Sequence, residues 1–243
     1  MNHTTSRPGT LFRNRRFTSG VCLFLASVLL LAGAGWTTCA REDGSQRGHT
    51  VILVSIDGFR WDYLDRGITP NLSGLAERGV RAEGLVPPFP TKTFPSHYTM
   101  VTGLMPDRHG IVSNTMYDPV FDARFSMSER DEVQNGRWYE GEPVWVTAER
   151  AGRPTAPLFW PGSEAEIDGV RPSHWLPFDV RMPYRDRVQW VLDRLDLPEP
   201  ERPTFLTIYF AGTDHAGHET GPDSEETLAE ISRADAAVGL LLE

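Results

Sequence analysis

The chain contains few cysteines and a single lysine. Both cysteines, Cys22 and Cys39, lie in the first 40 residues, so the rest of the sequence offers no disulfide, thiol nucleophile or thiolate metal ligand. The lysine is Lys92, and 33 acidic residues outnumber 24 basic ones to give a formal net charge of −9. So acidic a chain lacks the broad basic face that a nucleic-acid polymer needs. A small phosphorylated substrate remains compatible with it, because a bound metal ion reverses the local field.

The long apolar stretch over residues 21–34 is too short for a comfortable membrane span of about 20 residues. It follows Arg13, Arg15 and Arg16 and is succeeded by small residues up to Ala40, which is the pattern of a secretory signal. We therefore expect a signal peptide over 1–40, a linker over 41–49, and a periplasmic or secreted protein without a stable membrane span. The alternatives are a retained membrane anchor and a lipid on Cys39.

The body of the chain has the pattern of an α/β fold. The apolar runs Thr50–Ile56 and Thr204–Phe210 are typical of strands buried on both faces, and Val80–Val86 is expected to form another strand. Apolar spacing, prolines and glycines predict helices over 69–79, 94–102, 143–151, 184–195 and from 224 to the end. Strands alternating with helices predict a mostly parallel sheet between helical layers over residues 50–243.

Two acidic residues follow the main predicted strands, where ligands collect in α/β sheets. Asp57 comes directly after the first strand, and Asp214 comes shortly after the last. His218 lies four residues beyond Asp214, with Gly217 between them to allow a tight turn, and this pair suits a divalent ion such as zinc. Each residue also has an ordinary interpretation, Asp57 as a turn or cap residue and His218 as a solvated loop histidine.

A hydroxyl group stands at the start of the helix predicted over Phe94–Thr102. Thr93 precedes this helix and Pro95 suits its first turn, where the helix dipole and free N–H groups favour an anion. The local pattern by itself favours Thr93 as an N-cap. Asn114 is a candidate hydrogen-bond donor to a transition-state oxygen, or alternatively a turn asparagine.

These residues belong to a series of short segments that occur in one order along the chain. The segments are Val54–Arg60, Pro90–Pro95, Thr102–Leu104, His109–Ile111, Asn114 with Met116–Pro119, Phe159–Glu164, and Asp214 with His218. From Val51 to the last residue the sequence resembles the nucleotide pyrophosphatase/phosphodiesterase family of the alkaline phosphatase superfamily. The resemblance implies an alkaline-phosphatase-like core and a nucleotide phosphodiesterase that uses two Zn²⁺ ions.

The resemblance also implies a role for each metal-site residue. Asp57 would bind one zinc ion, and Asp214 with His218 would bind the other. Thr93 would be the nucleophile, with its oxygen held by metal. Attack on phosphorus would give a covalent threonine intermediate, and water would then release a nucleoside monophosphate.

Further residues are implied in substrate binding. Asn114 and the backbone N–H of Phe94 would hold a non-bridging phosphoryl oxygen. The Phe94 ring and Trp175 would stack on a base, and Trp160 is another aromatic candidate. Core packing is the alternative for Trp160 and Trp175, and it is the expectation for Trp145 within its amphipathic helix.

Other functions are compatible with parts of this pattern. A sulfatase shares the superfamily architecture, but it needs a Cys or Ser that matures to an aldehyde, which Thr93 cannot form. A phosphomonoesterase and a lysophospholipid phosphodiesterase remain close alternatives. An inactive zinc- or nucleotide-binding fragment is the alternative from a different class, since the sequence ends at Leu240–Glu243 inside an apolar helix without a stop signal.

The count of ligands yields a first prediction. Catalytic zinc takes about three protein ligands, whereas this chain offers Asp214 and His218 for one ion and Asp57 with the Thr93 oxygen for the other. We therefore expect a fragment of a longer protein which, made alone, binds less than two zinc ions and turns over little or no substrate. Metal analysis and a diester assay on the purified chain measure both. Two tightly held zinc ions with robust turnover would mean that other histidines, His97, His109, His174 or His215, are ligands.

Overall fold

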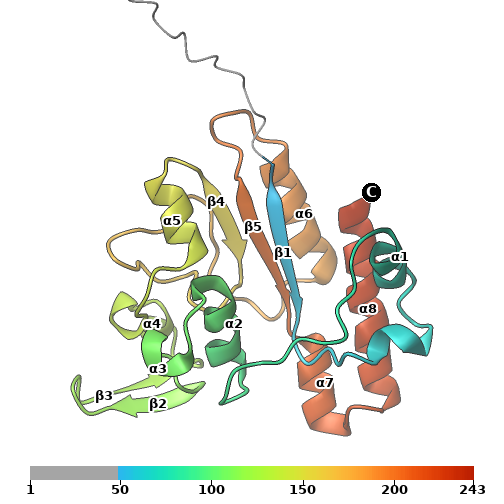
Figure 1. Cartoon of the computed structure of the whole chain (residues 1–243), viewed down its shortest axis with the longest axis horizontal. Helices are drawn as coiled ribbons and strands as arrows, with labels where there is room; N and C mark the ends of the chain where they lie inside the picture. The colour runs from blue at the N-terminus through green and yellow to red at the C-terminus, as the bar shows by residue number, and fades with distance from the viewer. Residues whose placement is uncertain (1–48) are drawn as a thin grey trace, which may run out of the picture. The chain divides into compact units, whose positions relative to one another are not determined.

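The computed structural model describes residues 49–243. The expected signal peptide, Cys22, Cys39 and nearly all of the expected linker lie outside the described residues. The central sheet has three parallel strands in the order β1 (Val51–Ile56), β5 (Phe205–Phe210) and β4 (Thr155–Leu158), as Figure 1 shows. Strand β4 is short and contains a proline, and the sequence analysis did not predict it.

Helices and a separate hairpin surround this sheet (Figure 1). The hairpin pairs β2 (Thr115–Asp118) with β3 (Ala123–Ser126) in antiparallel register, and it was not predicted. The α-helices are α1 (Pro70–Arg78), α2 (Thr93–Thr102), α3 (Pro106–His109), α4 (Arg130–Val133), α5 (Val144–Arg150), α6 (Tyr184–Leu195), α7 (Gly212–Thr220) and α8 (Glu225–Leu242). Short 3₁₀ turns, η1 (Tyr63–Arg66) and η2 (Gly136–Trp138), complete the described elements.

Apolar side chains form a core on each face of the sheet. Leu206 and Ile208 of β5 are buried with residues of α6 and α8 in one core. The other core joins α2, α5 and the hairpin, and Phe205 of β5 packs against it. Alternate residues of one strand thus serve opposite faces, which confirms the expected α/β fold with a parallel sheet between helical layers. Trp145 is fully buried in the second core, as predicted.

The sequence-based expectations fail at two apolar segments. Val80–Val86 forms no strand: Val80, Leu85 and Val86 are 98%, 77% and 91% exposed, and no described strand pairs with this segment. Apolar β-branched residues do not make a strand without a partner. Strand β1 is only half-buried because it lies at an edge of the described sheet.

Among residues 49–243, no helix combines the length and apolarity needed to cross a membrane.

A buried carboxylate joins α1 to α8. Asp235 of α8 is 2% exposed, and its Oδ1 accepts the backbone N–H of Leu72 at 2.8 Å. Its Oδ2 accepts the side-chain amide of Asn71 at 2.9 Å and the backbone N–H of Asn71 at 3.3 Å. Asp235 therefore satisfies N–H groups that the first turn of α1 cannot satisfy internally, and its charge suits the helix dipole.

Removing this carboxylate should destabilise the protein. We expect Asp235→Ala to lower the free energy of unfolding by about 2–4 kcal/mol, because it leaves buried donors unsatisfied and opens a cavity. Urea denaturation measures the change. Asp193→Ala, which removes an exposed aspartate of α6, is the matched control and should stay within about 0.5 kcal/mol of the wild type. Equal stability of the two variants would contradict this role of Asp235.

Candidate active site

Two carboxylates meet where β1 and β5 end. The strands pair in register up to Ile56 and Phe210, and the Asp57 N–H donates to the Phe210 carbonyl oxygen at 2.9 Å. The next residue, Gly58, has φ +74°, and a Cβ atom placed on it would lie 2.7 Å from the Cα of Asp214. Only glycine permits this approach and this backbone conformation. The chain thus brings Asp57 and Asp214 together, as predicted from their positions after the strands.

Asp214 and His218 lie on a helix rather than in the predicted loop. Both belong to α7, which begins directly after β5, and Gly217 is an ordinary helical residue there. The spacing of four residues puts the two side chains on one helical face, with His218 Nε2 3.5 Å from Asp214 Oδ1. The expected tight turn is therefore wrong, but the expected proximity of the two side chains is correct.

The local electrostatics favour a cation at these carboxylates. Burial raises the pKa of Asp214, and the nearby charge of Asp57 raises it further. Like charges held together disfavour ionisation, and a bound cation reverses that effect.

Thr93 is the first residue of α2 and not its N-cap. Lys92 occupies the N-cap position in an extended conformation, without a side-chain capping bond. Within residues 49–243 the Thr93 hydroxyl makes no side-chain hydrogen bond, and Thr93 is half-buried. The N-cap interpretation is thus overturned. Pro95 lies in the first turn, as predicted.

Asn114 is tied to the same end of α2. Its Oδ1 accepts the backbone N–H of Phe94 at 2.9 Å. This bond orients the amide so that Nδ2 remains as its donor group. We expected the Phe94 N–H and Asn114 both to hold a phosphoryl oxygen. In the structure the Phe94 N–H donates to Asn114 instead. Asn114 itself remains placed next to Thr93 in space, although 21 residues separate them in sequence.

A buried histidine joins Thr93 to strand β1. His97 is 3% exposed, and burial lowers its pKa, so the ring is neutral at pH 7. The Thr93 carbonyl oxygen lies 2.7 Å from Nδ1 and can only accept, so Nδ1 carries the proton. Nε2 then accepts the Ser55 hydroxyl at 2.7 Å. His97 also lies within range of the charges of Asp57 and Asp214. It thus joins the start of α2 to β1 two residues before Asp57.

A tyrosine holds Asp57 from the neighbouring strand. The Tyr209 hydroxyl donates to Asp57 Oδ2 at 2.7 Å, and burial raises the pKa of Tyr209 so that the hydroxyl stays protonated. Sequence reasoning missed both Tyr209 and His97. Tyr209 reads as one more apolar residue of a buried strand, and His97 as one more residue of a helix. Only their partners, far away in sequence, reveal the polar role.

The two tryptophans predicted to bind substrate differ in exposure. Trp160 is 1% exposed, and its indole N–H donates to the His97 carbonyl oxygen at 3.0 Å. Such a ring offers no face to a base, so the packing alternative is correct for Trp160. Trp175 is half-buried and has the Arg171 guanidinium 4.8 Å from its ring centre. Phe94 is 9% exposed and meets Phe125 edge-to-face.

The described donors match zinc in kind but not in number. Asp57, Asp214 and His218 offer the carboxylate and imidazole ligands that zinc accepts. Within residues 49–243, however, no group of three His, Cys, Asp or Glu side chains converges on one point. The residues fit part of a divalent metal centre.

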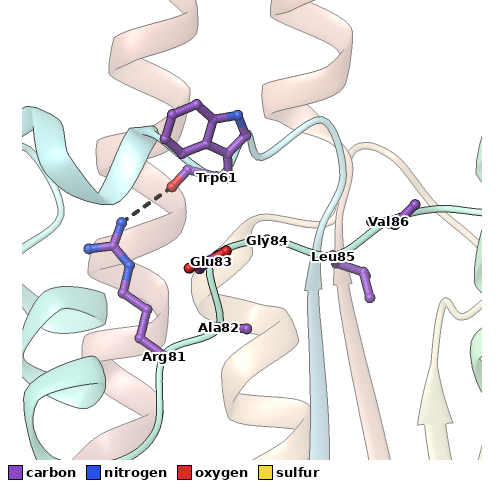
Figure 2. Close-up of a pocket in the computed structure, with 7 residues that line it drawn as sticks. All are labelled: Trp61, Arg81, Ala82, Glu83, Gly84, Leu85 and Val86. Carbon is purple, nitrogen blue, oxygen red and sulfur yellow. Dashed lines mark hydrogen bonds between the residues drawn. The ribbon is translucent and has the colours of Figure 1, made fainter.

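A hollow of about 770 Å³, whose lining residues Figure 2 shows, is lined by none of the predicted site residues. It is lined by Trp61 and residues 81–86, and Arg81 Nη2 donates to the Trp61 carbonyl oxygen at 3.4 Å. Because it contains none of the carboxylates or hydroxyls described above, we do not assign the chemistry to it.

The fold and the strand-end carboxylates define an α/β protein of the alkaline-phosphatase type. Residues 51–243 match the family described as type I phosphodiesterase / nucleotide pyrophosphatase, and the chain belongs to that family. This confirms the resemblance seen in the sequence motifs.

Curated and solved relatives agree with this assignment. Human ectonucleotide pyrophosphatase/phosphodiesterase family member 1 is 43% identical over 195 residues, which cover 79% of this chain and 21% of that protein. An uncharacterized pyrophosphatase/phosphodiesterase of Schizosaccharomyces pombe is 46% identical over 80% of this chain and 40% of its own length. The structure of murine ectonucleotide pyrophosphatase/phosphodiesterase 5 superposes with a TM-score of 0.75 at 34% identity, over 80% of this chain and 52% of that one. The chain thus spans well under two thirds of the length of these relatives.

The raised pKa of Asp214 predicts a stability effect in metal-free buffer. A carboxyl group whose pKa rises on folding destabilises the folded state once the pH exceeds its unfolded value, here 3.8. We therefore expect Asp214→Asn to stabilise the metal-free chain at pH 7 by about 0.5–1 kcal/mol, a figure reduced for solvent screening. The gain should vanish near pH 3, where the group is protonated in both states.

Denaturant unfolding with a chelator present, at both pH values, measures this effect. The exposed Asp107→Asn is the matched control and should change stability little at either pH. A loss of stability for Asp214→Asn at pH 7 in the chelator would contradict the repulsion between the two carboxylates.

Proposed function

We propose that this protein is an exported, zinc-dependent hydrolase that cleaves phosphodiester or pyrophosphate bonds of nucleotides through Thr93. One observation carries the proposal. The uncapped hydroxyl-bearing residue at the start of α2 is tied through His97 to the strand end where Asp57 and Asp214 meet. A nucleophile beside a charged, cation-favouring site is what phosphoryl transfer requires.

The relatives support both the nucleotide and the threonine. Several are named ectonucleotide pyrophosphatases/phosphodiesterases, and one from Crotalus durissus collilineatus is a venom phosphodiesterase. Murine member 5 has been solved as an inactive threonine-to-alanine variant in complex with AMP. We infer that Thr93 has the corresponding role here and that the substrate carries a nucleoside monophosphate group.

The proposed reaction assigns a step to each of these site residues. Thr93 Oγ1 attacks phosphorus and loses its proton, the bond from phosphorus to the leaving oxygen breaks, and the leaving group takes up a proton in exchange. Asn114, oriented by its bond to Phe94, directs Nδ2 to a non-bridging oxygen and stabilises the charge that develops there. Water then cleaves the threonine ester and releases the nucleoside monophosphate.

Metal ions would be held by the strand-end donors. Asp57 would hold one zinc ion, with Tyr209 fixing the carboxylate, and Asp214 with His218 would hold the other. When bound, zinc supplies positive charge that lowers the pKa of the threonine hydroxyl and stabilises the transferring phosphoryl group.

The nucleophile assignment predicts a selective loss of activity. Thr93→Ala should lower kcat/KM for a nucleotide diester more than about tenfold, which is about 1.4 kcal/mol, because the covalent route is lost. Thr93→Ser should keep part of the activity, since a hydroxyl remains. The fold and metal content should persist in both variants, because the carboxylate and histidine donors are untouched.

The assay runs at high enzyme concentration with added zinc, so that the low turnover expected of this chain can be measured, and again with a chelator. Thr91→Ala is the matched control: it removes an exposed threonine two residues away whose hydroxyl donates to the Pro88 carbonyl oxygen. A loss below tenfold for Thr93→Ala would exclude Thr93 as the nucleophile. A panel of ATP, a dinucleotide, a lysophospholipid and a simple phosphate monoester then identifies the substrate class.

A further inference from the structure

The segment over residues 171–178, which we call the Trp175 arm, has neither helix nor strand along its length. Its backbone conformation is therefore not determined by a hydrogen-bonded ladder. Side chains and carbonyl oxygens from the rest of the fold hold it instead, and Glu164 does so at both ends. The side-chain carboxylate of Glu164 accepts a hydrogen bond from the Phe178 N–H at 3.0 Å. The backbone carbonyl oxygen of Glu164 accepts a hydrogen bond from the Arg171 guanidinium.

Glu164 is itself firmly anchored. Its side chain is 5% exposed, and its carboxylate is paired with the guanidinium of Arg130 and with the Gln134 side-chain amide at 3.2 Å. A buried carboxylate is costly unless it is fully paired. Here every partner either belongs to the Trp175 arm or fixes Glu164 from the region of α4. The buried charge therefore serves to hold the arm in one position.

The middle of the arm has anchors of its own. Ser173 donates its backbone N–H and its hydroxyl to the Glu149 carboxylate at 2.7 and 2.8 Å. The His174 N–H donates to the Thr155 carbonyl oxygen at 3.0 Å. Ser173 and His174 hold the arm just before Trp175, and Phe178 holds it three residues after. An irregular segment held at several points loses little further entropy when it binds a ligand.

The tryptophan at the centre of the arm has one face occupied. The Arg171 guanidinium lies 4.8 Å from the Trp175 ring centre, within the range of a cation–π contact, while its Nη1 is bound to the Glu164 carbonyl oxygen. Trp175 remains half-buried rather than enclosed. A large ring that is backed on one face by a guanidinium and keeps part of its surface exposed suits a flat ligand.

The arm ends at the wall of the carboxylate site. Phe178 packs 6.1 Å from the ring of Tyr209, centre to centre, and the Tyr209 hydroxyl donates to Asp57. The contacts that position Trp175 therefore connect to those that position the candidate metal ligand.

We propose that Arg171 is a positioning residue that holds the Trp175 ring from one face so that the other face stacks on the base of the nucleotide. This inference rests on the proposed function and adds to it. Arg171 should matter for the base and not for the phosphate, because its guanidinium is engaged by the ring, by a backbone carbonyl and by the Glu166 carboxylate at 3.9 Å. Damage to the fold would weaken the binding of both groups alike.

The test compares two ligands that share a phosphate and a ribose. Calorimetric titration of the full chain in added zinc measures AMP and ribose 5-phosphate separately. We expect Arg171→Met to weaken AMP binding about fivefold and Arg171→Lys less, because lysine keeps a cation near the ring. Trp175→Ala should weaken AMP binding by about 5- to 100-fold. Ribose 5-phosphate binding should change less than about twofold in each variant, because none of them removes a phosphate contact.

Arg202→Met is the matched control, since Arg202 is an exposed arginine that also donates to a backbone carbonyl, that of Leu197. It should bind both ligands as the wild type does. Equal weakening of both ligands by Arg171→Met, or no weakening of AMP, would overturn the inference. If the wild type binds ribose 5-phosphate as tightly as AMP, the base adds nothing to binding. That result would overturn this inference but leave the proposed function standing. Binding of neither ligand by the wild type would overturn the proposed nucleotide function and the inference with it.

Discussion

The site depends on the close approach of two chain segments at the ends of β1 and β5. Gly58 lies so near the backbone of Asp214 that a Cβ atom would not fit, and the carboxylates of Asp57 and Asp214 are held together despite their like charge. Apolar burial along the two paired strands supplies the free energy that opposes this repulsion. Functional sites commonly contain like-charged side chains that the fold holds close together.

Buried hydrogen bonds from neighbouring side chains then hold Asp57 and the start of α2. Tyr209 holds Asp57, and His97 connects the Thr93 carbonyl oxygen to Ser55 on β1. His97 and Tyr209 are both buried, so these contacts orient Asp57 and the start of α2 from the interior of the protein. Such supporting hydrogen bonds typically decide how precisely a metal ligand or nucleophile is placed.

The same principle extends to the irregular part of the fold. The Trp175 arm has no ladder of its own, yet Glu164 and Glu149 secure it through charged and polar contacts. A buried, paired carboxylate such as that of Glu164 brings little net stability, and Glu149 is half-buried. Their structural value is that they fix the position of a half-buried aromatic ring that regular secondary structure does not reach.

The sequence by itself determined the elements whose pattern is local. Continuous apolar runs identified β1 and β5, and helical spacing identified α6 over Tyr184–Leu195. The order of Asp57, Thr93 and Asp214 along the motifs identified the candidate site, because position after a strand or before a helix can be read from the chain.

Tertiary structure decided whatever depends on a partner distant in sequence. The apolar Val80–Val86 is irregular because no described strand pairs with it, while the short β4 forms because β5 is beside it. Tyr209 meets Asp57 across 152 residues, and Trp160 is buried only because the core closes around it. Such contacts leave no periodic signal, since a hydrogen bond or a packed face depends on where the folded chain brings its partner.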